Sequence, residues 1–319
     1  MFGRLIAAAV IAVCAVPSHA QSWPDRSVKI VVPFPAGGPL DFTARLLAEK
    51  LSNRFKQPFV IENRAGVAGN IGTEVVAKAA PDGYTLLMVL DTPLTAHPPL
   101  YPNLPFDPER DFAPISIVAT FSQMLVVHPS VPVDSLAAFV RLATENRVTH
   151  GSGGAKGNPG YLTLEALRLQ AGFEVAHVAY KGNPQVVTDL IGGHVQAGFL
   201  ATPSVVTLVR EGKLRGLAVS SLQRSQGAPD VPTVAEVGYP EFDIAFALVM
   251  LAPAKTPASI HWVLEHEVQQ AVKSSDVQAR LRAQELEPAG TTGAEAENWL
   301  KTATARWKRV IQAAKIQLD

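Results

Sequence analysis

The stretch VVPFPAGGPLDFTARLLAEKL, residues 31–51, decides how this chain folds. It begins as an apolar, β-branched run and is then broken by two prolines and two glycines at 33–38. Apolar residues then recur at intervals of three or four from Leu40 to Phe55, which predicts one apolar face of a helix. The stretch therefore predicts a buried strand over 28–34, a glycine-rich junction and an amphipathic helix.

The same order of strand, glycine-rich turn and helix recurs along the chain. The strand 59–63 leads into a turn at 64–72 and a helix, and the stretch 147–172 again has the pattern of strand, loop and helix. Strands that alternate with helices of about ten residues predict an α/β fold, with parallel sheets and helices on both faces. Two extended stretches, 115–129 and 242–254, are long for single strands, so we place the crossing between two lobes there. The length of 319 residues also suits two domains, at ~100–200 residues for each.

The first twenty residues have the pattern of a secretory signal peptide. A positive charge at Arg4 precedes an apolar run from Leu5 to Val16, and the segment ends in Ser18-His19-Ala20. Small residues stand at the two positions that signal peptidase reads, and the run is shorter than the ~20 residues that span a bilayer. We therefore expect export, with cleavage near Ala20-Gln21 and a mature chain that starts near Gln21.

The mature chain would contain no cysteine, because Cys14 is the only one in the sequence. This excludes disulfides, thiolate nucleophiles and cysteine metal sites. A lipoprotein anchor at Cys14 is the alternative to a secretory signal cleaved near Gln21, but Val13 is a poor neighbour for lipidation. Removing Arg4 leaves one basic residue fewer than the 28 acidic ones. A nearly neutral chain without a basic run gives no reason to expect nucleic acid or an anionic membrane as a partner.

Three glycine-rich junctions, at 36–41, 66–72 and 151–158, each follow a strand and precede a helix. In the first, Gly38 suits the N-cap and Pro39 the first helical position. Glycine leaves backbone N–H groups uncovered and a helix start carries a partial positive charge, so such a junction can bind an anion without a basic side chain. Open parallel sheets bind ligands outside the carboxyl ends of their strands. The three junctions together predict a site for a small anion.

Other residues have weaker claims to a function. Asp41, in the first turn of the predicted helix, either caps that helix, which we favour, or contacts the ligand. The segment 151–157 resembles a dinucleotide fingerprint, but Lys156 occupies the third glycine position. His150 stands where a nucleophile elbow needs glycine, and the segment HWVLEH at 261–266 lacks the spacing of zinc proteases. The sequence therefore predicts no catalytic group, no metal site and no cofactor.

Five blocks of the sequence resemble the Bug family, the periplasmic solute receptors of tripartite tricarboxylate transporters. They are VVPFPAGGPLDFTARLLAEKL, VIENRAGVAGNIGTEVVAKAAPDGYTLL, HVAYKGNPQVVTDLIGGHVQAGF, GKLRGLAVSSLQRSQGAPDVPTVAEVGYP and LAPAKTP. The resemblance covers essentially the whole mature chain. It implies a two-lobed periplasmic binding protein that closes like a flytrap about two crossing hinge strands. After a signal peptide at 1–20, the first lobe would take residues 21–121 and 246–319, and the second lobe residues 122–245.

The resemblance also implies a function. The chain would capture a dicarboxylate, tricarboxylate or aromatic acid through backbone groups and water, and would pass it to the permease subunits of a tripartite tricarboxylate transporter. It would act as a monomer without a cofactor and not as an enzyme. The ligand residues implied in the first lobe are Phe34, Pro35, Ala36, Gly37, Gly38, Asp41, Gly69 and Asn70. Those implied in the second lobe are Ser152, Gly153, Gly154, Asn158, Tyr180, Lys181, Ala201 and Thr202.

Departures from the family lie in the second lobe. The loop at 151–158 is one residue longer than usual, Tyr161 stands where histidine is common, and Ala179 replaces a frequent proline. The identity of the carboxylate is therefore open, as is the question of whether Lys156 and Lys181 reach it or remain at the surface. Two other functions also stay open, a sensor that presents the ligand to a signalling protein and an exported hydrolase that acts on a carboxylate.

Overall fold

The computed structural model describes residues 23–145, 148–154 and 156–318. The predicted signal peptide, its cleavage site and Cys14 lie outside these residues. The strands are β1 (Val28–Val32), β2 (Phe59–Asn63), β3 (Thr85–Leu90), β4 (Phe112–Val127), β5 (Val148–Gly153), β6 (Val175–Tyr180), β7 (Ala197–Ala201), β8 (Arg215–Val219), β9 (Ala245–Pro253) and β10 (Glu287–Pro288). The helices are α1 (Pro39–Phe55), α2 (Asn70–Ala77), α3 (Thr92–Thr95), α4 (Leu136–Glu145), α5 (Pro159–Ala171), α6 (Asn183–Ile191), α7 (Thr202–Arg210), α8 (Ala258–Lys273), α9 (Ser275–Arg282) and α10 (Gly293–Ala313), with a short 3-10 helix at Val67–Gly69.

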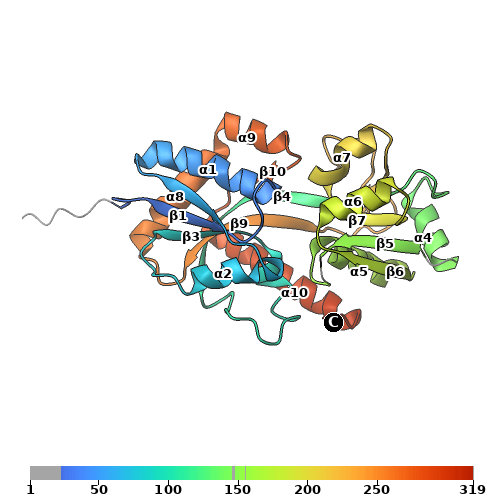
Figure 1. The fold of residues 1–319 in the computed structure, drawn as a ribbon, viewed down its shortest axis with the longest axis horizontal. Coiled ribbons are helices and arrows are strands. Elements are labelled where there is room, and N and C mark those ends of the chain that lie inside the picture. Colours follow the sequence, from blue (N-terminus) through green and yellow to red (C-terminus); the bar gives the residue numbers. More distant parts are fainter. Residues whose placement is uncertain (1–22, 146–147, 155, 319) are drawn as a thin grey trace, which may run out of the picture.

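Two sheets share the long strand β4 (Figure 1). In the first sheet the order is β2-β1-β3-β9-β4, with β10 on the far side of β4, and β1 is parallel to β2 and β3. In the second sheet β4 is followed by β7, β5 and β6, with β8 also paired to β4, and β5 is parallel to β6 and β7. We call each sheet with the helices on it a lobe.

The strand β4 crosses from one lobe to the other. It pairs with β9 over Phe112–Ser122 and with β7 over Gln123–Val127. The two long extended stretches seen in the sequence thus correspond to β4 and β9, which lie side by side in the middle of the molecule (Figure 1). The residue boundaries of the lobes, at 121/122 and 245/246, stay a prediction.

The segment from β1 to α1 forms in the predicted order of strand, junction and helix, although β1 ends at Val32 and not at residue 34. Four of the five residues of β1 are buried, as in a strand covered on both faces. Gly38 is the N-cap of α1 and proline opens the helix. The apolar positions Leu40, Ala44 and Leu47 are buried. The strand β1 runs from the outer end of the first lobe toward the second, so the loop that follows it faces the second lobe (Figure 1).

Helices cover both faces of both sheets. In the first lobe α1, α8 and α9 pack on one face, and α2 with the first half of α10 on the other. In the second lobe α4 and α5 cover one face, and α6 with α7 the other. The second half of α10 joins the core of the second lobe, where Trp307 stacks on Phe246 with 5.6 Å between ring centroids. Among the described residues, none of the helices is both long enough and apolar enough to cross a bilayer.

Candidate functional site

The loop between β1 and α1 is folded around the carboxylate of Asp41. Oδ2 accepts hydrogen bonds from Gly37 N and Arg45 Nε, each at 2.9 Å. Oδ1 accepts from Asn63 Nδ2 at 2.9 Å, and the same amide donates to Phe34 O at 3.1 Å. Burial acts to raise the pKa of Asp41, but the hydrogen bonds outweigh it and hold the pKa below its ordinary value. The carboxylate therefore shapes the loop before α1 and does not cap the helix, so the favoured interpretation of Asp41 as a cap is wrong. Its contact with a ligand stays a prediction.

The start of α1 offers backbone donors. Gly38, the N-cap, is extended at φ −83° and ψ 171°, and within the described chain no side chain caps this helix. A Cβ added at Gly38 would meet no described atom within 4 Å, so the backbone there borders open space. The described hydrogen bonds outside regular elements include none from the N–H of Gly38 or Leu40. These N–H groups can therefore donate to an anion.

The second junction packs directly on the first. Val67 and Ala68 adopt left-handed backbone angles, with φ of 45° and 51°, which non-glycine residues rarely do. Such strain is found most often at functional sites. A Cβ at Gly69 would lie 3.1 Å from the ring of Phe34, so glycine lets the two junctions close up. The helix α2 starts at Asn70, inside the turn predicted at 64–72, and no side chain of the described chain caps it.

A third loop of the first lobe, from Asp91 to His97, was not predicted from the sequence. It follows β3, which lies parallel to β1, and Pro93 packs 3.2 Å from the Cβ position of Gly69. His97 Nδ1 lies 2.7 Å from Asn70 Oδ1, and both side chains are buried. Burial lowers the pKa of His97 to about 4. The tripeptide Asp-Thr-Pro directly after a strand is typical of a helix start and could have pointed to this loop.

Asp91 is a buried carboxyl group where β3, β9 and α10 meet. Its Oδ2 accepts from Trp299 Nε1 at 3.1 Å, and its N–H donates to Ala247 O at 2.9 Å. Oδ1 is enclosed and has no hydrogen-bond partner in the described part of the chain. Burial raises the pKa of Asp91 to about 7, although Trp299 and the positive charge of Arg306 oppose the rise. A carboxyl group with this pKa changes its charge near neutral pH.

In the second lobe, side chains occupy the helix start. Asn158 caps α5, because its Oδ1 accepts from Tyr161 N at 3.1 Å. Its Nδ2 donates to Ser152 Oγ at 3.1 Å, and Ser152 Oγ lies 2.7 Å from His177 Nε2. The ring of Tyr161 packs against His177 with 4.6 Å between centroids. The third junction thus differs from the other two, which have no side-chain cap. Neither Tyr161 nor His177 was among the predicted ligand residues.

Tyr180 and Thr202 have partners within the protein. The hydroxyl of Tyr180 donates to Asp189 Oδ2 at 2.6 Å, and burial together with this bond raises the pKa of Tyr180 to about 12. Thr202 Oγ1 donates to Ser122 O at 3.0 Å, which ties the start of α7 to the crossing strand β4. The side chain of Lys181 is exposed. Of these residues, Thr202 is the one held at the hinge.

The predicted ligand residues differ in their access to solvent. The exposed ones are Pro35, Ala36, Gly37 and Lys181. The half-buried ones are Phe34, Gly38, Gly153, Gly154, Asn158 and Tyr180. The buried ones are Asp41, Gly69, Asn70, Ser152, Ala201 and Thr202. Contacts link Gly37 to Asp41 and place Gly69 against Phe34 in the first lobe, and they link Ser152 to Asn158 in the second. We call these two groups the predicted half-sites, because their binding of a ligand stays a prediction.

The lobes touch close to these half-sites. A Cβ at Gly157, in the loop before α5, would lie 3.2 Å from Leu100 and 3.3 Å from His97. At the hinge, Ser225 Oγ of the second lobe donates to Glu285 Oε2 of the first at 2.7 Å. A cavity of about 410 Å³ opens at the hinge, and its lining includes Thr202, Ser122, Asp243 and Trp299. The hinge cavity is thus lined in part by a predicted ligand residue.

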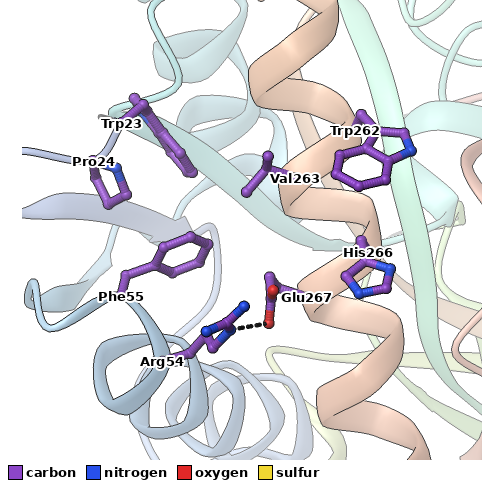
Figure 2. A pocket seen from close by; sticks show the side chains of 8 residues that line it. All are labelled: Trp23, Pro24, Arg54, Phe55, Trp262, Val263, His266 and Glu267. Carbon is purple, nitrogen blue, oxygen red and sulfur yellow. Dashed lines mark hydrogen bonds and ion pairs between the residues drawn. The ribbon is translucent and has the colours of Figure 1, made fainter. Parts of the chain in front are cut away.

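A second cavity, of about 450 Å³, lies away from the junctions. Figure 2 shows it between the start of the described chain, the end of α1 and the helix α8. Arg54 and Glu267 form an ion pair of 2.8 Å on its wall. Its lining is Trp23, Pro24, Arg54, Phe55, Trp262, Val263, His266 and Glu267, and so includes none of the predicted ligand residues.

Comparisons with known proteins bear on the whole chain. Residues 43–316 match the family described as the tripartite tricarboxylate transporter family receptor. The chain is 36% identical over 321 residues to protein BugT of Bordetella pertussis, covering 100% of this chain and 97% of that one. The solved structure of R. palustris Rpa4515 with adipate is similar with a TM-score of 0.84 at 33% identity, covering 92% and 99% of the two chains. MatC (Rpa3494) from Rhodopseudomonas palustris with bound malate is similar with a TM-score of 0.79 at 28% identity, covering 91% and 100%. These similarities confirm the predicted two-lobed α/β fold and the resemblance seen in the sequence.

Proposed function

Because the chain belongs to the family of tripartite tricarboxylate transporter receptors, we propose that it captures a small organic carboxylate in the periplasm and delivers it to a permease of that transporter class. The observation that carries this proposal is the pair of uncapped helix starts, those of α1 and α2, packed side by side in the first lobe. Adipate and malate, each with two carboxylates, are named in two of the similar structures. The family is one of solute receptors and not of enzymes.

Backbone donors would hold the carboxylate. Burying an ionised group without partners costs several kcal/mol or more, so a receptor needs donors already in place. The N–H groups of Gly38 and Leu40 are oriented by α1, and the helix dipole adds a partial positive charge. The bonds of Asp41 fix the loop around them. Approach of the second lobe would then replace the water on the open side of the ligand.

The two-lobed arrangement is suited to capturing a ligand by closure of the lobes around it. The crossing strands β4 and β9 would act as the hinge, with the lobes divided at 121/122 and 245/246. The second lobe would supply the residues around Ser152 and Asn158 and read the far end of the ligand. The receptor would work as a monomer and leave the cytoplasm by a signal peptide at residues 1–20.

One observation bears on the alternative of an exported hydrolase. Ser152 Oγ and His177 Nε2 are 2.7 Å apart, a distance that a serine nucleophile and its base would also show. Ser152 is fully buried, however, and its Oγ also accepts from Asn158. A nucleophile must reach its substrate, so we assign Ser152 to the cap of α5 and keep the receptor as the proposal.

Thermal unfolding with a panel of ligands tests the function. Adipate, malate, citrate and benzoate are each titrated into purified protein, with the uncharged diamide of adipate as the matched control. A receptor is stabilised by RT ln(1 + [L]/Kd), roughly 2.7 kcal/mol at a hundred times Kd, and the ligand is recovered unchanged. Stabilisation by none of the four acids, or equal stabilisation by the diamide, would contradict the proposal. Recovery of a converted product would favour the hydrolase.

Delivery to a permease needs a second experiment. Bacteria that carry the receptor and its permease should take up the labelled acid, and deletion of the receptor should stop the uptake. If uptake persists while a ligand-dependent transcriptional response is lost, the protein presents its ligand to a sensor instead.

A further inference from the structure

His97 is a buried side chain that touches both lobes. Its Nδ1 lies 2.7 Å from Oδ1 of Asn70, the first residue of α2. His97 and Asn70 are only 1% and 4% exposed, so water does not compete freely for this bond. The ring packs against Tyr101 with 4.8 Å between centroids. No role was predicted for His97 from the sequence.

The bond to Asn70 fixes the tautomer of the imidazole. An amide oxygen can only accept a hydrogen bond, so Nδ1 of His97 carries the proton and donates it. Because burial lowers the pKa of His97 to about 4, the ring is neutral near pH 7 and Nε2 carries no proton. The ring thus has one donor, and that donor is committed to Asn70.

The same bond fixes the amide of Asn70. With Oδ1 turned to His97, the NH₂ group points away from it. The described hydrogen bonds include none in which Asn70 Nδ2 is the donor, and this atom is not among the enclosed polar atoms without a partner. The atom is therefore not fully enclosed, although Asn70 as a whole is only 4% exposed. It lies at the start of α2, where no described side chain caps the helix.

We propose that His97 is a positioning residue of the ligand site, which holds the Asn70 amide so that its NH₂ group donates to the ligand carboxylate. The inference rests on the proposed function, because the acceptor is the carboxylate of the captured acid. A freely rotating amide would offer its oxygen to the anion as readily as its nitrogen. The bond from His97 removes that choice before the ligand arrives.

The other edge of the ring meets the second lobe. A Cβ at Gly157 would lie 3.3 Å from Cδ2 and 3.4 Å from Nε2 of His97. The loop before α5 thus rests on the imidazole edge that Asn70 does not use. The second lobe thus borders the same ring that bonds to Asn70 of the first lobe.

Two substitutions of His97 test the role by binding of adipate, measured by calorimetry. His97→Leu keeps much of the volume but removes the donor, and should raise the Kd for adipate roughly 10- to 100-fold, the range for a hydrogen bond to a charged group. His97→Asn places an amide nitrogen near the position of Nδ1 and should restore most of the affinity. Wild-type affinity in His97→Leu, or no rescue by His97→Asn in a folded protein, would overturn the proposal.

A spectroscopic readout does not depend on these variants folding or on the choice of acid. NMR of the ¹⁵N-labelled wild-type imidazole should show Nδ1 protonated and Nε2 bare near pH 7. An Nε2–H tautomer would mean that Asn70 donates to His97, and would overturn the proposal by itself. If the tautomer is as expected but no acid binds the wild type, the proposed function fails and the positioning role fails with it. If adipate binds wild type and His97→Leu alike, only the positioning role fails.

Discussion

At Gly38 a side chain would fit the fold but fill the space that we propose for the ligand. No described atom lies within 4 Å of its Cβ position, and its φ of −83° is open to any residue. We expect Gly38→Leu to keep the unfolding temperature of the wild type while calorimetry detects no adipate binding. Gly38→Ala, which adds one methyl group, should weaken binding less. Equal affinity in the leucine variant would show that the anion lies elsewhere.

Asp41 should matter through the loop that it holds. In Asp41→Asn the amide loses the charge that faces Arg45 and presents a nitrogen where N–H groups now donate. Urea unfolding should show a loss of roughly 1–3 kcal/mol, the cost of leaving buried polar groups without partners, and adipate should bind more weakly. The control Arg45→Gln changes a half-exposed partner and should cost under about 1 kcal/mol. Full stability in Asp41→Asn would contradict this role.

For single residues, the sequence predicts the features that depend on neighbours in the chain. Gly38 and Pro39 could be placed at the N-cap and first turn because these preferences act between neighbouring residues. The partner Asn63, which joins Asp41 to Phe34, comes from the next strand, so no local pattern contains it. The same holds for His97, which acquires its role only by lying against Asn70 in the folded chain.

Among the elements, α2 packs tightly against the loops around Pro33 and Arg64 at Gly72. A Cβ at Gly72 would lie 2.7 Å from Cβ of Pro33 and 2.8 Å from the carbonyl oxygen of Arg64, so backbone would have to shift. We expect Gly72→Ala to lower the free energy of unfolding by roughly 1–3 kcal/mol, as overpacking does, and to weaken adipate binding because the start of α2 is displaced. Urea unfolding and calorimetry measure the two effects.

Val75, on the exposed side of the same helix, provides the control. Val75→Ala should change stability by no more than about 0.5 kcal/mol and leave adipate affinity unchanged. A Gly72→Ala variant as stable as this control would mean that the junctions are not packed as described.

Elements with strong periodicity could be predicted, and helix starts less well. The strand 59–63 matches β2, whereas α2 begins at Asn70, within the turn expected at 64–72. The third junction was expected to be open like the other two, but Asn158 caps α5. Ser152 of β5 accepts a hydrogen bond from the capping side chain of Asn158 and so helps to hold it at the helix start. This contact joins two elements, so the pattern of residues around Asn158 could not predict it.

For the whole molecule, Asp91 makes stability depend on pH. Its pKa is raised from 3.8 to about 7, so between these values the folded state binds more protons than the unfolded state. The contribution of Asp91 to the free energy of unfolding therefore falls as pH rises through this window and levels off above it. The loss amounts to at most roughly 4 kcal/mol.

Asp91→Asn removes this titration while the amide oxygen can still accept from Trp299. The stability of Asp91→Asn relative to wild type should therefore increase from pH 4 to pH 8, which urea unfolding at several pH values measures. Taking the difference cancels the contributions of His97 and His150, whose pKa values burial lowers. A difference that is flat with pH would contradict the raised pKa of Asp91.

The arrangement of two lobes could be predicted from the alternation of strands and helices and from the two long stretches that became β4 and β9. The path of α10 could not. The sequence predicts that α10 has an apolar face, but it does not indicate which apolar surface that face covers. In the folded chain, Trp307 of α10 packs with the core of the second lobe. This helix therefore connects the lobes on the side away from α1 (Figure 1).

We propose that backbone N–H groups at two helix starts hold a carboxylate, and a titration of ¹⁵N-labelled protein with adipate, followed by amide NMR, tests this. We expect the largest saturable shifts on the amides of Gly38, Leu40 and Asn70, and we expect these shifts to vanish in Gly38→Leu. Saturable binding with shifts confined to the surroundings of Lys156 and Lys181 would contradict it.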